Sequence, residues 1–362
     1  MSSAHSSPSV DPVAAEIDAS GVHIDLRVDA YASCSDKERI TTAWRDGRIV
    51  RGGSDSRRRL DILSETPAYS EQALSDLSTQ VTLAALDALR GTRLLLHAAG
   101  VAAPDGRVLA LVGPSGRGKT TASRHLGRHY GYVSDETVAV DPDLTVYPYR
   151  KPLSIIVEGK PFKEQIAPSD LGLLPLPDAP LRLTGITLLD RDPDTDAPGA
   201  FPVDLIDAIC EMTAQISYLP ELPSPLQYVA RIVDQIGGVT RLIYRDAVDL
   251  PALVDAMFAA PAPEAQPWTV APPAVGTGPW RCAEVDDAIL VDGRACILRE
   301  GTVTALDHRG ALAWTMCLEG ASTEQITHAA VAAFGEPHGS NPRDLMTQTL
   351  EELVAHGLLT KT

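Results

Sequence analysis

The sequence predicts an α/β fold built around a phosphate-binding loop, with a small β-rich region before it and an α+β module after it. Three observations support this prediction: a glycine-rich loop between an apolar run and a helical stretch, alternating strand and helix patterns around that loop, and a proline-rich segment near the C-terminal end. The 362 residues leave room for more than one domain. We expect, in order, a disordered terminus over 1–15, a β-rich region over 16–80, the phosphate-loop domain over 81–259, a linker over 260–279 and the C-terminal module over 280–362.

The region before the loop contains strand-like and helix-like patterns. The alternation of apolar and polar residues from Ile17 to Val28 predicts a strand, and Thr41–Val50 is also predicted to be a strand with a turn at Asp46-Gly47. From about Ser70 to Arg90, apolar residues recur every three or four positions, which predicts a helix that ends near Gly91.

The loop itself matches the phosphate-binding pattern G-x-x-x-x-G-K-[ST] at every fixed position. Its residues are Gly113, Pro114, Ser115, Gly116, Arg117, Gly118, Lys119, Thr120 and Thr121. The apolar run Val108–Val112 precedes it as a predicted strand, and a predicted helix from Thr120 to about His129 follows. In this context the glycines allow backbone N–H groups to face phosphate oxygens, Lys119 reaches the β- and γ-phosphates, and the Thr120 hydroxyl binds Mg²⁺. We therefore expect a nucleoside triphosphate site; the alternative is a chance glycine turn that opens a helix.

Two further features accompany the loop. Asp135 and Glu136 follow a predicted strand, 16 and 17 residues after Lys119. A strand returning from the loop helix would bring both carboxylates to the γ-phosphate, one to hold Mg²⁺ and one to accept a hydroxyl proton; the alternative is an acidic surface loop. His97 ends an apolar run before the loop strand, where its spacing alone favours a hydrogen-bonded core residue over a phosphate contact.

The pattern after Glu136 continues to alternate. Strands are predicted over Thr137–Val140, Leu153–Val157, Leu183–Leu189 and Gly238–Tyr244, with helices over 203–217, 224–235 and Leu250–Ala259. In the C-terminal module, strands are predicted over Ala288–Val291, Ala295–Leu298 and Val303–Leu306, with helices over 309–318, 322–334 and 342–357. Short strands beside three helices are typical of a winged-helix-type module, and the absence of a catalytic pattern there predicts a recognition role.

Composition narrows the class of protein. The 48 acidic and 31 basic residues give a formal net charge of -17, which argues against a nucleic-acid partner. The five cysteines are scattered without a C-x-x-C pair, which argues against zinc and a disulfide framework and is consistent with a reducing compartment. We find neither a signal-peptide pattern nor an apolar run of membrane-spanning length, so we expect a cytoplasmic protein without a membrane partner.

Three segments together resemble the catalytic core of the HPr serine kinase family, which is related to lasso-peptide kinases. They are Leu96–Gly100, Gly113–Thr120 and Tyr132–Val138. The resemblance implies ATP and Mg²⁺ as cofactors. It also implies Asp135 as general base, Lys119 and His97 as phosphate-side catalytic residues, and Thr120, Glu136 and Asp135 as the Mg²⁺ site. Kinases of this family often form hexamers, so a homo-oligomer is an option that the sequence itself does not decide.

The C-terminal module is similar to PqqD-like domains, on Leu306–Trp314, the turn at Gly320 and the stretch Asp344–Leu359. Such domains bind the leader of a ribosomally made precursor peptide by adding it as a strand to a sheet edge. In this setting Trp314 is expected to be a core anchor. The two resemblances together imply a kinase that phosphorylates a Ser or Thr hydroxyl of a precursor peptide. The alternatives are an ATP-binding chaperone or scaffold that presents the peptide to other enzymes, a regulatory ATPase, and a small-molecule kinase.

Overall fold

The computed structural model describes residues 13–28, 33–49, 57–62, 71–113, 119–159, 163–261, 264–337 and 339–361. Contacts between residues divide the chain into two compact units. Unit 1 comprises Met1–Phe201 and Arg241–Pro261, and unit 2 comprises Pro202–Thr240 and Ala262–Thr362. The chain therefore leaves unit 1, contributes a segment to unit 2, returns, and leaves again.

The N-terminal part of unit 1 is a three-stranded sheet of β1 (Val13–Ala19), β2 (Val22–Val28) and β3 (Arg57–Ile62). The prediction of one strand from Ile17 to Val28 is wrong, because the chain reverses at Ser20-Gly21, so that β1 and β2 form an antiparallel hairpin. Both turn residues have positive φ, 59° and 85°, as a tight hairpin turn requires. The Gly21 amide donates to Asp18 Oδ1 at 2.6 Å, which fixes the turn.

The strand predicted over Thr41–Val50 is also wrong. The helix α1 (Cys34–Ala43) ends within this stretch, and a short 3₁₀ turn, η1 (Arg45–Gly47), follows it. Arg48 forms an isolated β-bridge with Ile17, and Val50 lies outside the described residues. A capping box between Ser33 and Asp36 starts the helix, and Ile40 and Ala43 bury one side of it. The capping signal at Ser33 lies N-terminal to the stretch predicted as a strand, and the helix that it starts continues into that stretch as far as Ala43.

Helix α2 (Glu71–Leu89) confirms the helix predicted from the periodicity. Its apolar stripe is buried, including Leu74, Leu77 and Val81. Gly91 follows with a φ of 69°, the left-handed conformation that commonly ends a helix.

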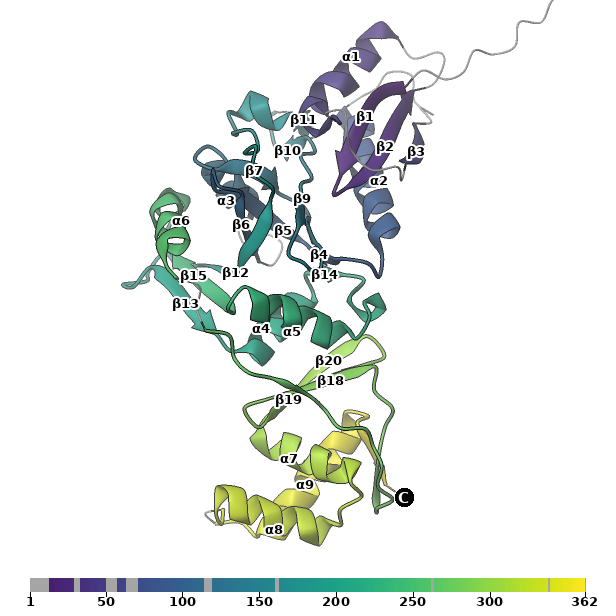
Figure 1. The fold of residues 1–362 in the computed structure, drawn as a ribbon, viewed down its shortest axis with the longest axis vertical. Helices are drawn as coiled ribbons and strands as arrows, with labels where there is room; N and C mark the ends of the chain where they lie inside the picture. Colours follow the sequence, from purple (N-terminus) through teal and green to yellow (C-terminus); the bar gives the residue numbers. More distant parts are fainter. Residues whose placement is uncertain are drawn as a thin grey trace, which may run out of the picture. The chain divides into compact units, whose positions relative to one another are not determined.

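The main sheet of unit 1 has the strand order β13-β15-β12-β6-β5-β7. Its strands are β5 (Ala98–Ala102), β6 (Arg107–Val112), β7 (Gly131–Ser134), β12 (Arg182–Arg191), β13 (Gly199–Val203) and β15 (Val239–Tyr244). β6 lies between a parallel neighbour, β12, and an antiparallel neighbour, β5 (Figure 1). The predicted mixed α/β architecture is thus confirmed, with the loop strand β6 inside the sheet.

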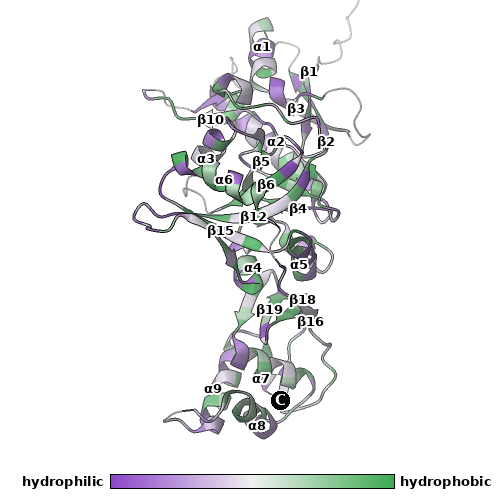
Figure 2. Cartoon of the chain, turned by 60° about the vertical axis from the view of Figure 1, so that its left-hand side comes forward, coloured by the Kyte–Doolittle hydropathy of each residue, from purple (hydrophilic) through white to green (hydrophobic). Residues whose placement is uncertain are grey.

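The main sheet is covered on one face by two helices. These are α3 (Lys119–Leu126) and α6 (Leu250–Ala259), which pack on each other and share an apolar cluster with β5, β6 and β15. β5 and β6 are hydrophobic along nearly their whole length (Figure 2), as expected for strands buried on both faces. α3 ends at Leu126, earlier than the predicted His129.

A second, smaller sheet lies beside the main one. Its antiparallel strands β4 (Leu94–Leu96), β8 (Val138–Val140) and β9 (Val146–Tyr147) belong to unit 1. The remaining elements of unit 1 are the hairpin β10 (Leu153–Ile155) and β11 (Glu164–Ile166) and the 3₁₀ turns η2 (Pro168–Leu171) and η4 (Ala247–Asp249).

Unit 2 is built around a sheet of order β16-β18-β19-β20. Its strands are β16 (Thr269–Val270), β18 (Asp287–Val291), β19 (Arg294–Arg299) and β20 (Thr302–Leu306), and its helices are α4 (Leu205–Thr213), α5 (Pro225–Gln235), α7 (His308–Leu318), α8 (Thr323–Phe334) and α9 (Pro342–Ala355). Short elements complete it: β14 (Ile216–Ser217), η3 (Leu219–Glu221), and β17 (Trp280–Cys282) paired with β21 (Leu359–Lys361). The three strands and three helices predicted for residues 288–357 are confirmed, and Trp314 is a core residue, 1% exposed.

Polar contacts join α4 and α5 to the sheet of unit 2. Buried Asp287, the first residue of β18, accepts hydrogen bonds from the backbone amides of Leu226 and Gln227 at 2.8 and 3.0 Å. It thereby caps the N-terminus of α5, whose own cap residue makes no side-chain hydrogen bond. Residues of the proline-rich stretch are also held: β16 pairs with β18, and the Gly276 amide donates to the Leu318 carbonyl at 2.9 Å.

Candidate functional site

Two neighbouring segments of unit 1 change from one sheet to the other at the same place. The chain passes from β4 to β5 through His97, and from β7 to β8 through Asp135, Glu136 and Thr137. β4 pairs with β8, and β5 pairs with β7, so the two crossings lie side by side. Polar residues that are distant in sequence are thus brought together by strand pairing.

The same register brings the phosphate loop to this point. Ala98 of β5 is paired with Val112 of β6 in the antiparallel ladder. His97 precedes Ala98 and Gly113 follows Val112, so His97 lies level with the first loop residue. Pro114, Ser115, Gly116, Arg117 and Gly118 lie outside the described residues, whereas Gly113, Lys119, Thr120 and Thr121 are described.

Lys119 opens α3 and turns back toward the start of the loop. Its Nζ donates to the Gly113 carbonyl at 2.5 Å, and the residue is 7% exposed. Burial lowers the pKa of Lys119, and the negative charge of Glu136 acts in the opposite direction. A buried ammonium group held by a backbone carbonyl would be stabilised by an anion at the same place, which fits the polyphosphate role predicted for it.

Asp135 is held by two neighbours at the end of β7. The Tyr132 hydroxyl donates to its Oδ1 at 2.9 Å, and Lys151 Nζ lies 3.9 Å from the same oxygen. Burial, with the charge of Asp135 as the next cause, raises the pKa of Tyr132 well above its usual range, so this hydroxyl remains a donor. The Asp135 side chain is 7% exposed, which excludes a freely solvated acidic loop at this position.

Glu136 and His97 form the more open side of the cluster. His97 Nδ1 lies 3.0 Å from the Glu136 backbone carbonyl and 3.6 Å from its Oε1. A hydrogen bond to a carbonyl requires a proton on Nδ1, which in a neutral imidazole leaves Nε2 as an acceptor. The side chains of His97 and Glu136 are 39% and 34% exposed, so both can meet a ligand.

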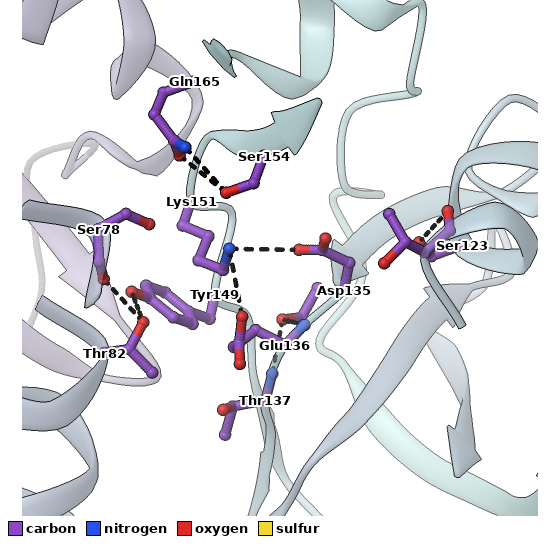
Figure 3. Close-up of polar contacts among 12 residues, drawn as sticks. Ser78, Thr82, Ser123, Asp135, Glu136, Thr137, Tyr149, Lys151, Ser154 and Gln165 are labelled. Atoms are coloured by element: carbon purple, nitrogen blue, oxygen red, sulfur yellow. Dashed lines mark hydrogen bonds and ion pairs between the residues drawn. The ribbon is translucent and has the colours of Figure 1, made fainter. Parts of the chain in front are cut away.

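Lys151 was not among the predicted site residues, yet its ammonium group contacts the carboxylates of both Asp135 and Glu136 (Figure 3). Its Nζ lies 3.3 Å from Glu136 Oε2 in addition to its contact with Asp135, and its side chain is 6% exposed. Tyr149 positions it: the Tyr149 amide donates to the Val133 carbonyl of β7 at 3.0 Å, and its hydroxyl shares a hydrogen bond of 2.8 Å with Thr82 of α2.

Sequence spacing could not have predicted this contact. Lys151 comes after a hairpin-like excursion through β8 and β9, and nothing in that spacing relates it to Asp135. The only indication in the sequence was the Lys-Pro-Leu-Ser run at 151–154, which is weakly similar to the HPr serine kinase pattern described above.

The side-chain oxygen atoms of the site suit Mg²⁺. In the described part of the chain, no group of three or more His, Cys, Asp or Glu residues could hold a metal ion. Mg²⁺ in nucleotide sites is typically held by one or two carboxylates together with phosphate oxygens and water, so such a group is not required. Thr120, Asp135 and Glu136 supply the hard oxygen atoms that this ion prefers, and they fit a Mg²⁺ that arrives with a nucleotide.

Among the described helices, none combines the length with the apolar composition that crossing a bilayer requires.

Comparisons with known proteins add little to this geometry. No protein-family model matches the chain, and no curated protein matches its sequence. Among solved structures, the chain is similar to the Hpr(Ser) kinase/phosphatase from Coxiella burnetii, with 13% sequence identity and a TM-score of 0.27. The match covers 46% of this chain and 93% of that one. A likeness at this identity and TM-score assigns neither a family nor a function to this chain.

Proposed function

We propose that this protein is an ATP-dependent kinase that phosphorylates a Ser or Thr hydroxyl of a precursor peptide. The observation that carries the proposal is the buried Asp135 carboxylate, which Tyr132 and Lys151 hold at the end of β7. β7 pairs with β5, which in turn pairs with β6, the strand before the phosphate loop. Phosphoryl transfer is catalysed mainly by positioning and charge stabilisation, and an oriented carboxylate is the group that aligns an acceptor hydroxyl.

Each residue of the cluster has a role in this proposal. Mg²⁺-bound ATP would supply the phosphoryl group. Lys119 binds its phosphate oxygens, and Thr120 and Glu136 hold the metal ion. Because Tyr132 occupies Oδ1 of Asp135, Oδ2 accepts the proton of the substrate hydroxyl. His97 Nε2, directed by the hydrogen bond at Nδ1, contacts the phosphate side of the site.

A non-catalytic role as an ATP-binding chaperone, scaffold or regulatory ATPase is the main alternative. The arrangement of Asp135 favours transfer. Burying a carboxylate costs free energy unless it is paired with a cation. Nucleotide binding requires the loop and Lys119 but does not require the buried Asp135–Lys151 pair, whereas transfer to an acceptor hydroxyl requires an oriented carboxylate.

Unit 2 is proposed to bind the peptide at the outer edge of β20. Within the described residues, both faces of its sheet are covered, by α4 and α5 on one side and α7 on the other. β16 pairs with β18 at one end of the sheet, and β20 pairs with β19 alone at the other. An extended peptide can add to such an edge through main-chain hydrogen bonds.

The first prediction concerns transfer itself. Incubation of the protein with Mg²⁺, ATP and the precursor peptide encoded beside its gene should add one phosphate to the peptide, detected by mass spectrometry. The Asp135→Asn variant keeps the size and the Tyr132 hydrogen bond but cannot accept the proton, so we expect it to bind ATP and to lose transfer by at least about a hundredfold. ATP hydrolysis without a phosphopeptide, in wild type and variant alike, would support the regulatory ATPase instead.

The second prediction concerns Lys151. Replacing it with Met leaves the buried Asp135 carboxylate and the partly exposed Glu136 carboxylate without their cation, and we expect kcat to fall by about a hundredfold. Lys151→Arg is the matched control, because it keeps the positive charge and should recover part of the rate. Equal rates for wild type and Lys151→Met would show that Lys151 has no part in the reaction.

The third prediction concerns peptide binding. Peptide bound along β20 should slow hydrogen exchange of backbone amides within Thr302–Leu306 by at least roughly tenfold, because outward amides gain partners. The amides of β18 provide the internal control, since this strand already lies between β16 and β19 in the sheet. Protection confined to residues outside unit 2 would place the peptide elsewhere.

A further inference from the structure

Two cysteines far apart in the sequence meet inside unit 2. Cys210 lies on α4 and Cys296 lies on β19, which α4 contacts, and the interaction between their thiol groups is the first cause of the pKa shift of each. Both cysteines are free thiols, and nothing in the proposed kinase chemistry uses them.

The contact follows from how α4 packs on the sheet. On α4, Asp207 lies one helical turn before Cys210, so both side chains share a face. On β19, Arg294 and Cys296 are two residues apart and therefore share a side of the strand. Arg294 Nη2 contacts Asp207 Oδ1 at 2.6 Å, and Arg294 Nη1 contacts Asp204 Oδ1 at 2.9 Å. The ion pairs hold α4 against β19 on the faces that carry the two cysteines.

The two thiols differ in access to solvent. Cys296 is 0% exposed, whereas Cys210 is only partly buried. A small oxidant can therefore reach Cys210 first, with Cys296 held behind it as the second thiol. This is the arrangement of an attacking and a resolving cysteine.

We propose that Cys210 and Cys296 are a modification site that forms a reversible disulfide when the protein meets hydrogen peroxide. The Cys210 thiolate attacks one peroxide oxygen and breaks the O–O bond, which gives a sulfenic acid on Cys210 and hydroxide that takes up a proton to become water. The Cys296 sulfur then attacks the Cys210 sulfur and displaces a second water. In total, two thiols and one peroxide yield one disulfide and two waters, and a thiol reductant reverses the change.

The local environment favours Cys210 as the attacking thiol. The hydrogen bond from the Cys296 thiol lowers the pKa of Cys210 and raises that of Cys296. The other half-buried and buried thiols behave differently, since burial raises the pKa of Cys282 to about 11 and that of Cys317 to about 12. Those two thiols stay protonated and react slowly.

A disulfide between Cys210 and Cys296 would link α4 covalently to β19, in the sheet β16-β18-β19-β20 of unit 2. Cys296 is paired with Ala305 of β20, and α4 also packs on β20. If the peptide binds along β20, which rests on the proposed function, oxidation would stiffen the strand pair that receives it. The modification itself can be measured without any activity assay.

The test is a peptide map of the full chain under non-reducing conditions, before and after hydrogen peroxide treatment. Cys34→Ser serves as the background, because Cys34 is exposed and would otherwise react. We expect a cross-linked peptide pair containing Cys210 and Cys296, two hydrogens lighter than the reduced pair, which disappears with dithiothreitol. The cross-link should persist in Cys282→Ser and be absent in Cys210→Ser.

Two results would overturn the proposal. One is Cys210 recovered as a sulfinic acid with Cys296 still reduced, which would mean that the thiols do not come close enough to couple. The other is Cys210 left reduced at a peroxide dose that oxidises Cys34 in the wild-type chain. Both results are independent of whether the protein transfers phosphate, so they leave the kinase proposal untouched.

Discussion

The candidate site depends on one constraint, the register between β5 and its two neighbours. Pairing of Ala98 with Val112 sets His97 level with the start of the phosphate loop, and pairing of Gly100 with Ser134 sets the acidic pair beside it. A shift of one residue in either ladder would move side chains to the opposite face of the sheet. Gly100 permits the close packing at this point, since a Cβ atom there would approach Val138 Cγ2 to 2.9 Å.

Charge balance is the second requirement of the site. Two carboxylates and one ammonium group are gathered at the end of β7, and Asp135 and Lys151 are both nearly inaccessible to solvent. Removing one member of a buried ion pair typically costs about 3–5 kcal/mol, because its partner is left without compensation. Buried ion pairs of this kind are typical of sites where charged groups must be held in a fixed orientation. Phosphoryl transfer is a reaction that requires such oriented charges.

Much of the fold could be predicted from local patterns. The helix over 71–89, the strand before the loop and all strands and helices from 287 to 355 follow from apolar periodicity and turn residues. The failures have local causes too. The Ser20-Gly21 turn lies within an alternating run, and the helix that begins with the capping box at Ser33 extends into the stretch that was predicted as a strand. Lys151 could not be predicted from spacing, since its place depends on the hydrogen bonds of Tyr149 to β7 and α2. The capping of α5 by Asp287 is likewise a tertiary contact, and no residue near α5 in the sequence indicates it.

In the proposed function, the phosphate loop, His97 and the Asp135–Glu136–Lys151 cluster serve a single nucleotide. The most direct measurement is a crystal structure with Mg²⁺ and a non-hydrolysable ATP analogue. We predict that the γ-phosphate lies within hydrogen-bonding distance of Lys119 and His97, with Asp135 Oδ2 facing its acceptor side. A nucleotide bound to the loop with its γ-phosphate directed away from Asp135 and Glu136 would contradict the claim.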